Sequence, residues 1–134
     1  MFKILEHTAD VGIFVRGESL EEFFAEAARG MFYIKCESPP EGEAITHEIH
    51  LISNDIEALL VDFLSELLFL SEIKNFVPME FNFIHIDDES LEVICIGTVV
   101  SSLVCSTEIK GVTHHLLNVE NTPNGWEAKI YFDL

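Results

Sequence analysis

The chain has 134 residues, 49% of them hydrophobic and 11 of them phenylalanine, which excludes an intrinsically disordered protein and predicts a single domain over residues 1–134. Seven Lys and Arg residues against 24 Asp and Glu residues give a formal net charge of −17, so direct nucleic-acid binding is not expected, because basic clusters normally hold phosphate backbones. A basic protein partner or a divalent cation is expected instead, and no apolar run approaches the roughly 20 residues that cross a membrane.

The first elements are a polar turn, a strand and a helix. The turn His-Thr-Ala-Asp-Val-Gly-Ile at residues 7–13 leads into an apolar strand over residues 13–16. Residues 19–22, Ser-Leu-Glu-Glu, form a capping box that opens a helix with apolar residues at helical spacing. Gly30 is expected to end this helix in a left-handed cap.

A strand and a second helix follow. Alternation of apolar and polar residues over residues 44–52 predicts a strand with one buried face. Asn54 and Glu57 stand at capping spacing for the next helix, whose apolar stripe widens to include Phe69 and predicts a well-buried helix. Pro78 forbids continuation of that helix.

The rest of the chain is predicted to be β-structure. Strands or strand-like stretches are expected over residues 81–86, 91–96, 98–104, 107–117 and 126–134. The acidic link at residues 87–90 is interpreted as a solvated hairpin turn in preference to a cation site, and Asn-Gly within residues 121–125 predicts a second tight turn. The fold class is therefore α+β, with two helices packed on the apolar face of an antiparallel sheet.

A metal site is one of two interpretations of the chain ends. If the early strand and the last strand lie side by side, the carboxylates of Asp10, Asp133 and the terminal residue Leu134 converge, and three hard oxygen anions suit Ca²⁺ or Mg²⁺. From spacing alone the simpler roles are favoured, because an Asp in a turn usually caps backbone N–H groups and an Asp near a chain end is usually solvated.

Lys110 has two interpretations as well. It is the only basic residue between Lys74 and Lys129 in an acidic chain. The commoner role is a solvent-facing strand lysine paired with a neighbouring carboxylate. The functional alternative is a contact residue for a partner protein or for the nucleotide bound to it.

The cysteines and histidines favour no zinc site. Three cysteines, an odd number, with two in apolar runs, indicate a reducing compartment without a disulfide framework, and the absence of a signal-peptide pattern predicts a cytoplasmic protein. The possible zinc ligands are Cys95, Cys105, His114 and His115, and no Cys-x-x-Cys pair is present among them. The two cysteines of this set are therefore interpreted as small buried hydrophobic residues. No nucleophile elbow or phosphate-binding loop is present, so no catalytic site is expected.

These motifs resemble the archease family over essentially the whole chain. The resemblance rests on the N-terminal turn, the first helix, the second helix and the closing strand, together with the run Ile-Lys-Gly-Val-Thr-His at residues 109–114. The family commonly has Ala where Gly111 stands and a more charged linker where residues 97–106 stand here.

The resemblance implies a cytoplasmic cofactor of the tRNA-splicing RNA ligase of the RtcB type. Such a cofactor promotes guanylylation of the ligase and multiple turnover, and is not itself an enzyme. The resemblance implies metal ligands at Asp10, Asp133 and Leu134, with Ca²⁺ favoured over Mg²⁺ or Mn²⁺, and a functional lysine at Lys110. The alternative function is a chaperone-like or scaffolding module with an incidental cation site.

Overall fold

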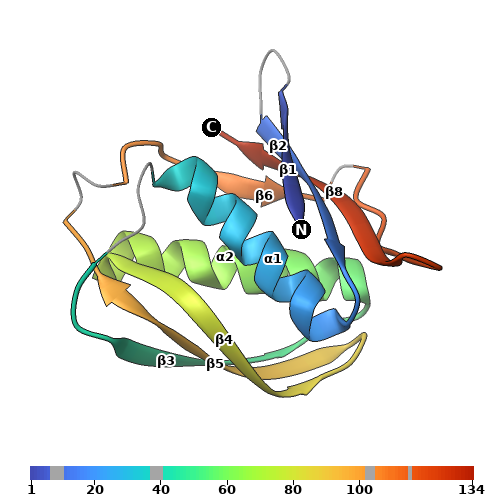
Figure 1. The fold of residues 1–134 in the computed structure, drawn as a ribbon, viewed down its shortest axis with the longest axis horizontal. Coiled ribbons are helices and arrows are strands. Elements are labelled where there is room, and N and C mark those ends of the chain that lie inside the picture. Colours follow the sequence, from blue (N-terminus) through green and yellow to red (C-terminus); the bar gives the residue numbers. More distant parts are fainter. Residues whose placement is uncertain (7–10, 37–40, 102–104, 115) are drawn as a thin grey trace.

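Two helices lie between two antiparallel sheets in the computed structural model, which describes residues 1–6, 11–36, 41–101, 105–114 and 116–134 (Figure 1). Each helix contacts strands of both sheets, so apolar side chains on opposite sides of each helix are covered. The α+β class with two helices packed on antiparallel strands is confirmed, and the strands are divided between two sheets. Neither helix of the described ranges is long and apolar enough to cross a membrane.

The first sheet joins the two ends of the sequence. Its main order is β1 (Phe2–Glu6), β2 (Val11–Gly17), β8 (Gly125–Asp133) and β6 (Gly111–Thr113), and β7 (Glu120–Thr122) also pairs with β8. The pairing of the early strand with the last one, which was the condition for the metal-site interpretation, is present, because β2 and β8 run antiparallel along their lengths. The strand expected over residues 107–117 is reduced to the three residues of β6.

The second sheet is built from the middle of the chain. Its order is β3 (Ile45–Ile52), β5 (Ser90–Val99) and β4 (Phe76–Ile86). β4 begins five residues before the predicted strand and includes Pro78, and its register against β5 shifts between Pro78 and Glu80. The shift is the irregularity by which a strand accommodates a residue without an N–H group.

The first helix, α1 (Leu20–Lys35), starts as predicted and ends later. The Ser19 hydroxyl accepts from the Glu22 backbone N–H at 3.1 Å, and the Glu22 carboxylate accepts from the Glu18 backbone N–H at 3.2 Å. The prediction that Gly30 ends the helix is wrong. A Cβ at Gly30 would lie 2.8 Å from the Ile13 side chain, so glycine permits close packing of α1 on the first sheet.

The second helix, α2 (Ile56–Lys74), is capped one residue later than predicted. Asp55, in place of Asn54, is the N-cap, and its carboxylate accepts from the Ala58 backbone N–H at 2.8 Å. The helix ends at Asn75, which has a left-handed conformation, before Pro78 is reached. The prediction that Phe69 is buried is wrong, because its side chain is 55% exposed.

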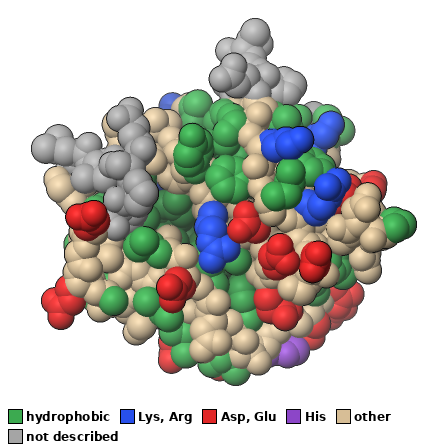
Figure 2. Space-filling model, viewed as in Figure 1, with side chains coloured by type: hydrophobic (Ala, Val, Ile, Leu, Met, Phe, Trp, Pro, Cys, Tyr) green, Lys and Arg blue, Asp and Glu red, His purple; other side chains and the backbone are tan. Residues whose placement is uncertain are grey.

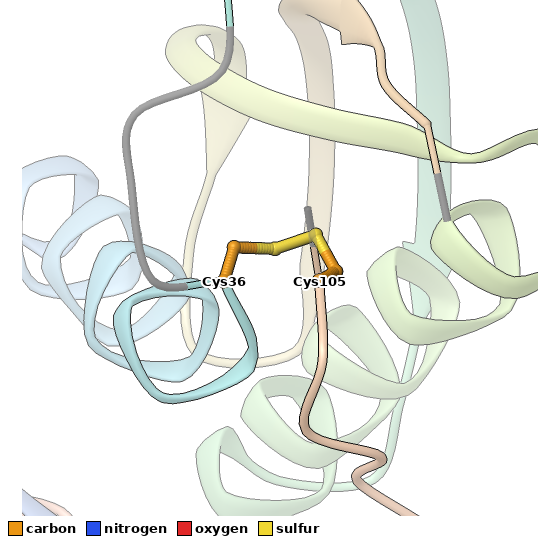
Figure 3. Close-up of a disulfide and its surroundings, with 2 residues drawn as sticks. All are labelled: Cys36 and Cys105. Carbon is orange, nitrogen blue, oxygen red and sulfur yellow. A yellow bond between two sulfur atoms is a disulfide. The ribbon is translucent and has the colours of Figure 1, made fainter. Parts of the chain in front are cut away.

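A disulfide corrects the prediction for the cysteines. Cys36, at the C-cap of α1, is bonded to Cys105, which lies 69 positions further along the chain (Figure 3). Only Cys95 is the buried, unpaired thiol that was expected. The pairing depends on contact between the end of α1 and the segment after β5. No local sequence pattern indicates this contact.

His47 introduces a buried polar atom between the helices and the second sheet. Its ring packs edge-on against Phe76 with centroids 4.6 Å apart, and its Nε2 atom is buried without a hydrogen-bond partner among the described residues. Burial, and to a smaller extent the charge of Lys74, lowers the pKa of His47 from 6.5. The folded state therefore resists protonation of this ring.

This resistance predicts a pH dependence of stability. Below pH 6.5 the unfolded chain binds a proton at His47 before the folded chain does, so the free energy of unfolding should fall as pH decreases from 7 to 5. His47→Gln should reduce that slope in urea titrations at several pH values. His50→Gln, at an exposed position of the same strand, is the matched control and should keep it. Equal slopes for the wild type and His47→Gln would refute the assignment.

Candidate functional site

Backbone pairing brings Lys110 and Asp133 together at the end of the first sheet. The Lys110 N–H donates to the Asp133 carbonyl oxygen at 2.8 Å, and Gly111 is the strand partner of Asp133. Both charged side chains are exposed, and Leu134 is 47% exposed. The structure thus joins the backbones of two candidate residues from different segments, and the side chain of each is exposed.

Alternation of buried and exposed residues sets the direction of these side chains. Ile109, which precedes Lys110, and Phe132, which precedes Asp133, are both fully buried in the core. Successive residues of a strand point to opposite sides, so Asp133, which follows Phe132 in β8, faces solvent. Lys110 lies just before β6 and is exposed as well. The prediction that Asp133 lies on the polar face of the last strand is confirmed, because its side chain is exposed.

Asp10 lies outside the described residues. Its chain neighbour Val11 is the first residue of β2 and is paired with Phe132, one position before Asp133. The described backbone therefore brings the residue that follows Asp10 to the C-terminal end of β8.

The donor chemistry of the described residues suits a hard cation. Asp133 and Leu134 carry carboxylate oxygens, which Ca²⁺, Mg²⁺ and Mn²⁺ prefer. Within the described ranges no group of three or more His, Cys, Asp or Glu residues is arranged to hold a metal ion. The zinc set loses Cys105, whose sulfur is in the disulfide, and His115 lies outside the described residues.

In the acidic turn at residues 87–90, the Asp87 carboxylate accepts hydrogen bonds from backbone N–H groups of the turn itself. One Asp87 oxygen accepts from the N–H groups of Glu89 at 2.9 Å and Ser90 at 2.8 Å. These backbone hydrogen bonds, that of Glu89 first, lower the pKa of the Asp87 carboxyl. The hairpin turn joining β4 and β5 is confirmed, and Asp87 stabilises it.

The sequence does not reveal a surface hollow of about 250 Å³ on the outer side of the first sheet. Its lining residues are Phe14, Leu116, Asn118, Glu120, Glu127, Ala128 and Lys129. Two of its carboxylates are already used, because Asn118 donates to Glu120 at 2.7 Å and Arg16 donates to Glu127 at 2.8 Å. The lining comes from separate segments, so no local motif marks it.

Carboxylates are distributed over the surface in several places. On the face shown in Figure 2, Asp and Glu side chains are spread among apolar ones, with a small number of Lys and Arg side chains between them. A distribution of this kind attracts cations and basic surfaces and repels phosphate chains.

Comparison with known proteins identifies the family of the chain. The model of the archease protein family (MTH1598/TM1083) matches residues 2–134. A protein archease of Methanosarcina mazei is 37% identical, covering 99% of this chain and 95% of its own length, and one of Pyrococcus furiosus is 30% identical, covering 96% and 95%.

Solved structures agree with the fold. The solution structure of protein 1598 of Methanobacterium thermoautotrophicum has a TM-score of 0.74 at 28% identity and covers 99% of this chain and 98% of its own. The crystal structure of an archease and possible chaperone from Thermotoga maritima, at 24% identity, shows the same fold with a TM-score of 0.70, covering 98% and 96%. The chain belongs to the archease family.

Proposed function

We propose that this protein activates a tRNA-splicing RNA ligase of the RtcB type, promoting guanylylation of the ligase and multiple turnover without catalysing ligation itself. Membership of the archease family supports this role. The observation that supports the site is the backbone hydrogen bond from Lys110 to Asp133, two residues whose charged side chains are both exposed.

The proposal assigns a divalent cation to the carboxylates of Asp10, Asp133 and Leu134. Oxygen donors favour Ca²⁺, with Mg²⁺ or Mn²⁺ as alternatives. Bound there, the cation would bind an oxygen of the partner or its nucleotide. Lys110 then contacts the ligase or the nucleotide through its ammonium group.

The partner is expected to present a basic surface. With a net charge of −17, the chain is attracted to Lys and Arg clusters and repelled by phosphate backbones. We therefore expect it to act by binding the ligase and not by binding RNA directly. We expect the protein to act in the cytoplasm together with the ligase.

Asp133→Asn is expected to lower the stimulation of the ligase at least tenfold, since it removes a ligand charge at nearly constant volume. The side chain is exposed, so the fold should survive, as circular dichroism would verify. The measurement is multiple-turnover RNA ligation by a cognate ligase with GTP and Mn²⁺, with and without the protein. Glu80→Gln, at an exposed position of the second sheet, is the charge-matched control.

Two outcomes would redirect this assignment. Stimulation by Asp133→Asn equal to that of the wild type would remove Asp133 from the site. Absence of stimulation by the wild type would favour the chaperone-like alternative, which the description of the Thermotoga maritima structure suggests. A chaperone-like module should suppress aggregation of unrelated clients and be indifferent to Asp133→Asn.

A further inference from the structure

A covalent link fastens the chain just before the candidate site to the first helix. The disulfide joins Cys36, at the end of α1, to Cys105, on the segment that follows β5 (Figure 3). Two residues further on, the Thr107 N–H donates to the Lys35 carbonyl oxygen at 3.3 Å. The disulfide and this hydrogen bond both hold residues 105–107 against the C-terminal end of α1.

The fastened segment leads directly to Lys110. Residues 105–110 contain no helix or strand, and their next anchors are the buried Ile109 side chain and the hydrogen bond from Lys110 to Asp133. Lys110 is five positions beyond Cys105, a distance that extended chain spans in at most about 18 Å. Because β6 has only three residues, few backbone bonds hold this stretch if the disulfide opens.

The third cysteine does not compete for this chemistry. Cys95 is fully buried in β5, and burial raises the pKa of its thiol to about 12. Thiol–disulfide exchange requires a thiolate with access to a sulfur atom. Cys105 is half-buried whereas Cys36 is 6% exposed, so Cys105 is the more exposed residue of the pair and the expected point of attack.

We propose that Cys36 and Cys105 form a reversible oxidation site, whose disulfide holds residues 105–113 in place and whose reduction loosens them. A small thiolate attacks Cys105 Sγ, the S–S bond breaks, and Cys36 leaves as a thiolate and takes a proton. A second small thiol then releases Cys105, giving two protein thiols and one small-molecule disulfide. A glutathione-type disulfide oxidises the pair by the reverse steps, in which its two sulfurs take up the two electrons.

Reduction is expected to affect the candidate site more than the second sheet. The oxidised protein keeps Lys110 beside Asp133, and the reduced protein samples open arrangements of this segment. Where such bonds occur in reducing compartments, they are usually transient or redox-sensing. The consequence for ligase stimulation rests on the proposed function, whereas the loosening itself does not.

The test compares hydrogen exchange of the full chain equilibrated with oxidised glutathione and with a phosphine reductant. Amides of residues 109–113 should exchange at least tenfold faster after reduction, while those of the hairpin at residues 86–90 should not change. Cys36→Ser/Cys105→Ser should match the reduced protein in both conditions, and Cys95→Ala should respond like the wild type. Melting temperature should drop by about 10 °C on reduction.

Mass spectrometry after alkylation in denaturant provides an independent measurement. One alkylated cysteine is expected in the oxidised protein and three in the reduced one. Three alkylated cysteines in both the oxidised and the reduced sample would overturn the proposal. A disulfide that resists reduction in the native protein would also overturn it. So would exchange at residues 109–113 that is unchanged or changes equally in the reference hairpin. Faster exchange without ligase stimulation in either redox state would refute only the proposed function.

Discussion

Phe63→Ala should lower the free energy of unfolding by about 3–5 kcal/mol, the cost of removing a buried aromatic side chain and leaving a cavity. Phe63 is fully buried in α2. Its ring lies 5.7 Å from that of Phe24 in α1, and 5.9 Å and 6.2 Å from those of Phe81 and Phe83 in β4, measured between centroids. Loss of this ring removes packing between both helices and the second sheet at once.

Urea unfolding followed by circular dichroism measures this effect, and α2 supplies its control. Phe69 has the same chemistry in the same helix but is 55% exposed, so Phe69→Ala should change the free energy of unfolding by less than about 1 kcal/mol. Similar losses for the two variants would show that burial of the Phe63 ring in this cluster does not dominate the effect, because alanine favours a helix more than phenylalanine does.

Gly97→Ala is expected to destabilise the protein by about 3 kcal/mol, at the upper end of overpacking effects. Gly97 pairs with Pro78 at the register shift of β4, and a Cβ there would overlap the Val77 carbonyl oxygen and lie 2.8 Å from the Pro78 Cα. Backbone atoms cannot move aside as a flexible side chain would, so the pairing of β4 with β5 must open.

Gly111→Ala is the matched control for this prediction. No atom lies within 4 Å of a Cβ built at Gly111, so the change should be neutral or slightly stabilising, by up to about 1 kcal/mol. That space would accommodate the methyl group of an alanine. Thermal unfolding of both variants measures the contrast, and equal destabilisation would show that loss of glycine, not the backbone overlap, is responsible.

Local patterns in the sequence predicted the elements whose signals are local. The capping box at Ser19 and the acidic hairpin after β4 were identified because hydrogen bonds within a few residues create them, and β3 was identified by its alternation of apolar and polar residues. The α+β class follows from the same patterns. Gly30 shows the opposite case, because contact with Ile13 on another element outweighs the local preference of glycine to end a helix.

The candidate site was predicted only in part for the same reason. Alternation placed Asp133 on the polar side of the last strand, but the neighbour of Lys110 depends on β6 pairing with β8. The disulfide likewise depends on a meeting of distant segments. Resemblance to a family supplied the set of Asp10, Lys110, Asp133 and Leu134, which residue spacing alone did not favour.

The division of strands between the two sheets determines which sheet can form first while the chain is being synthesised. The second sheet is formed by a continuous middle portion of the chain, and α2 lies within that portion. In the first sheet β1 and β2 can pair early, but β6 has no partner and β2 lacks its second neighbour until β8 has been synthesised. A nascent chain can therefore assemble its middle portion while Lys110 still lacks its hydrogen-bond partner Asp133, so the candidate site forms after the second sheet.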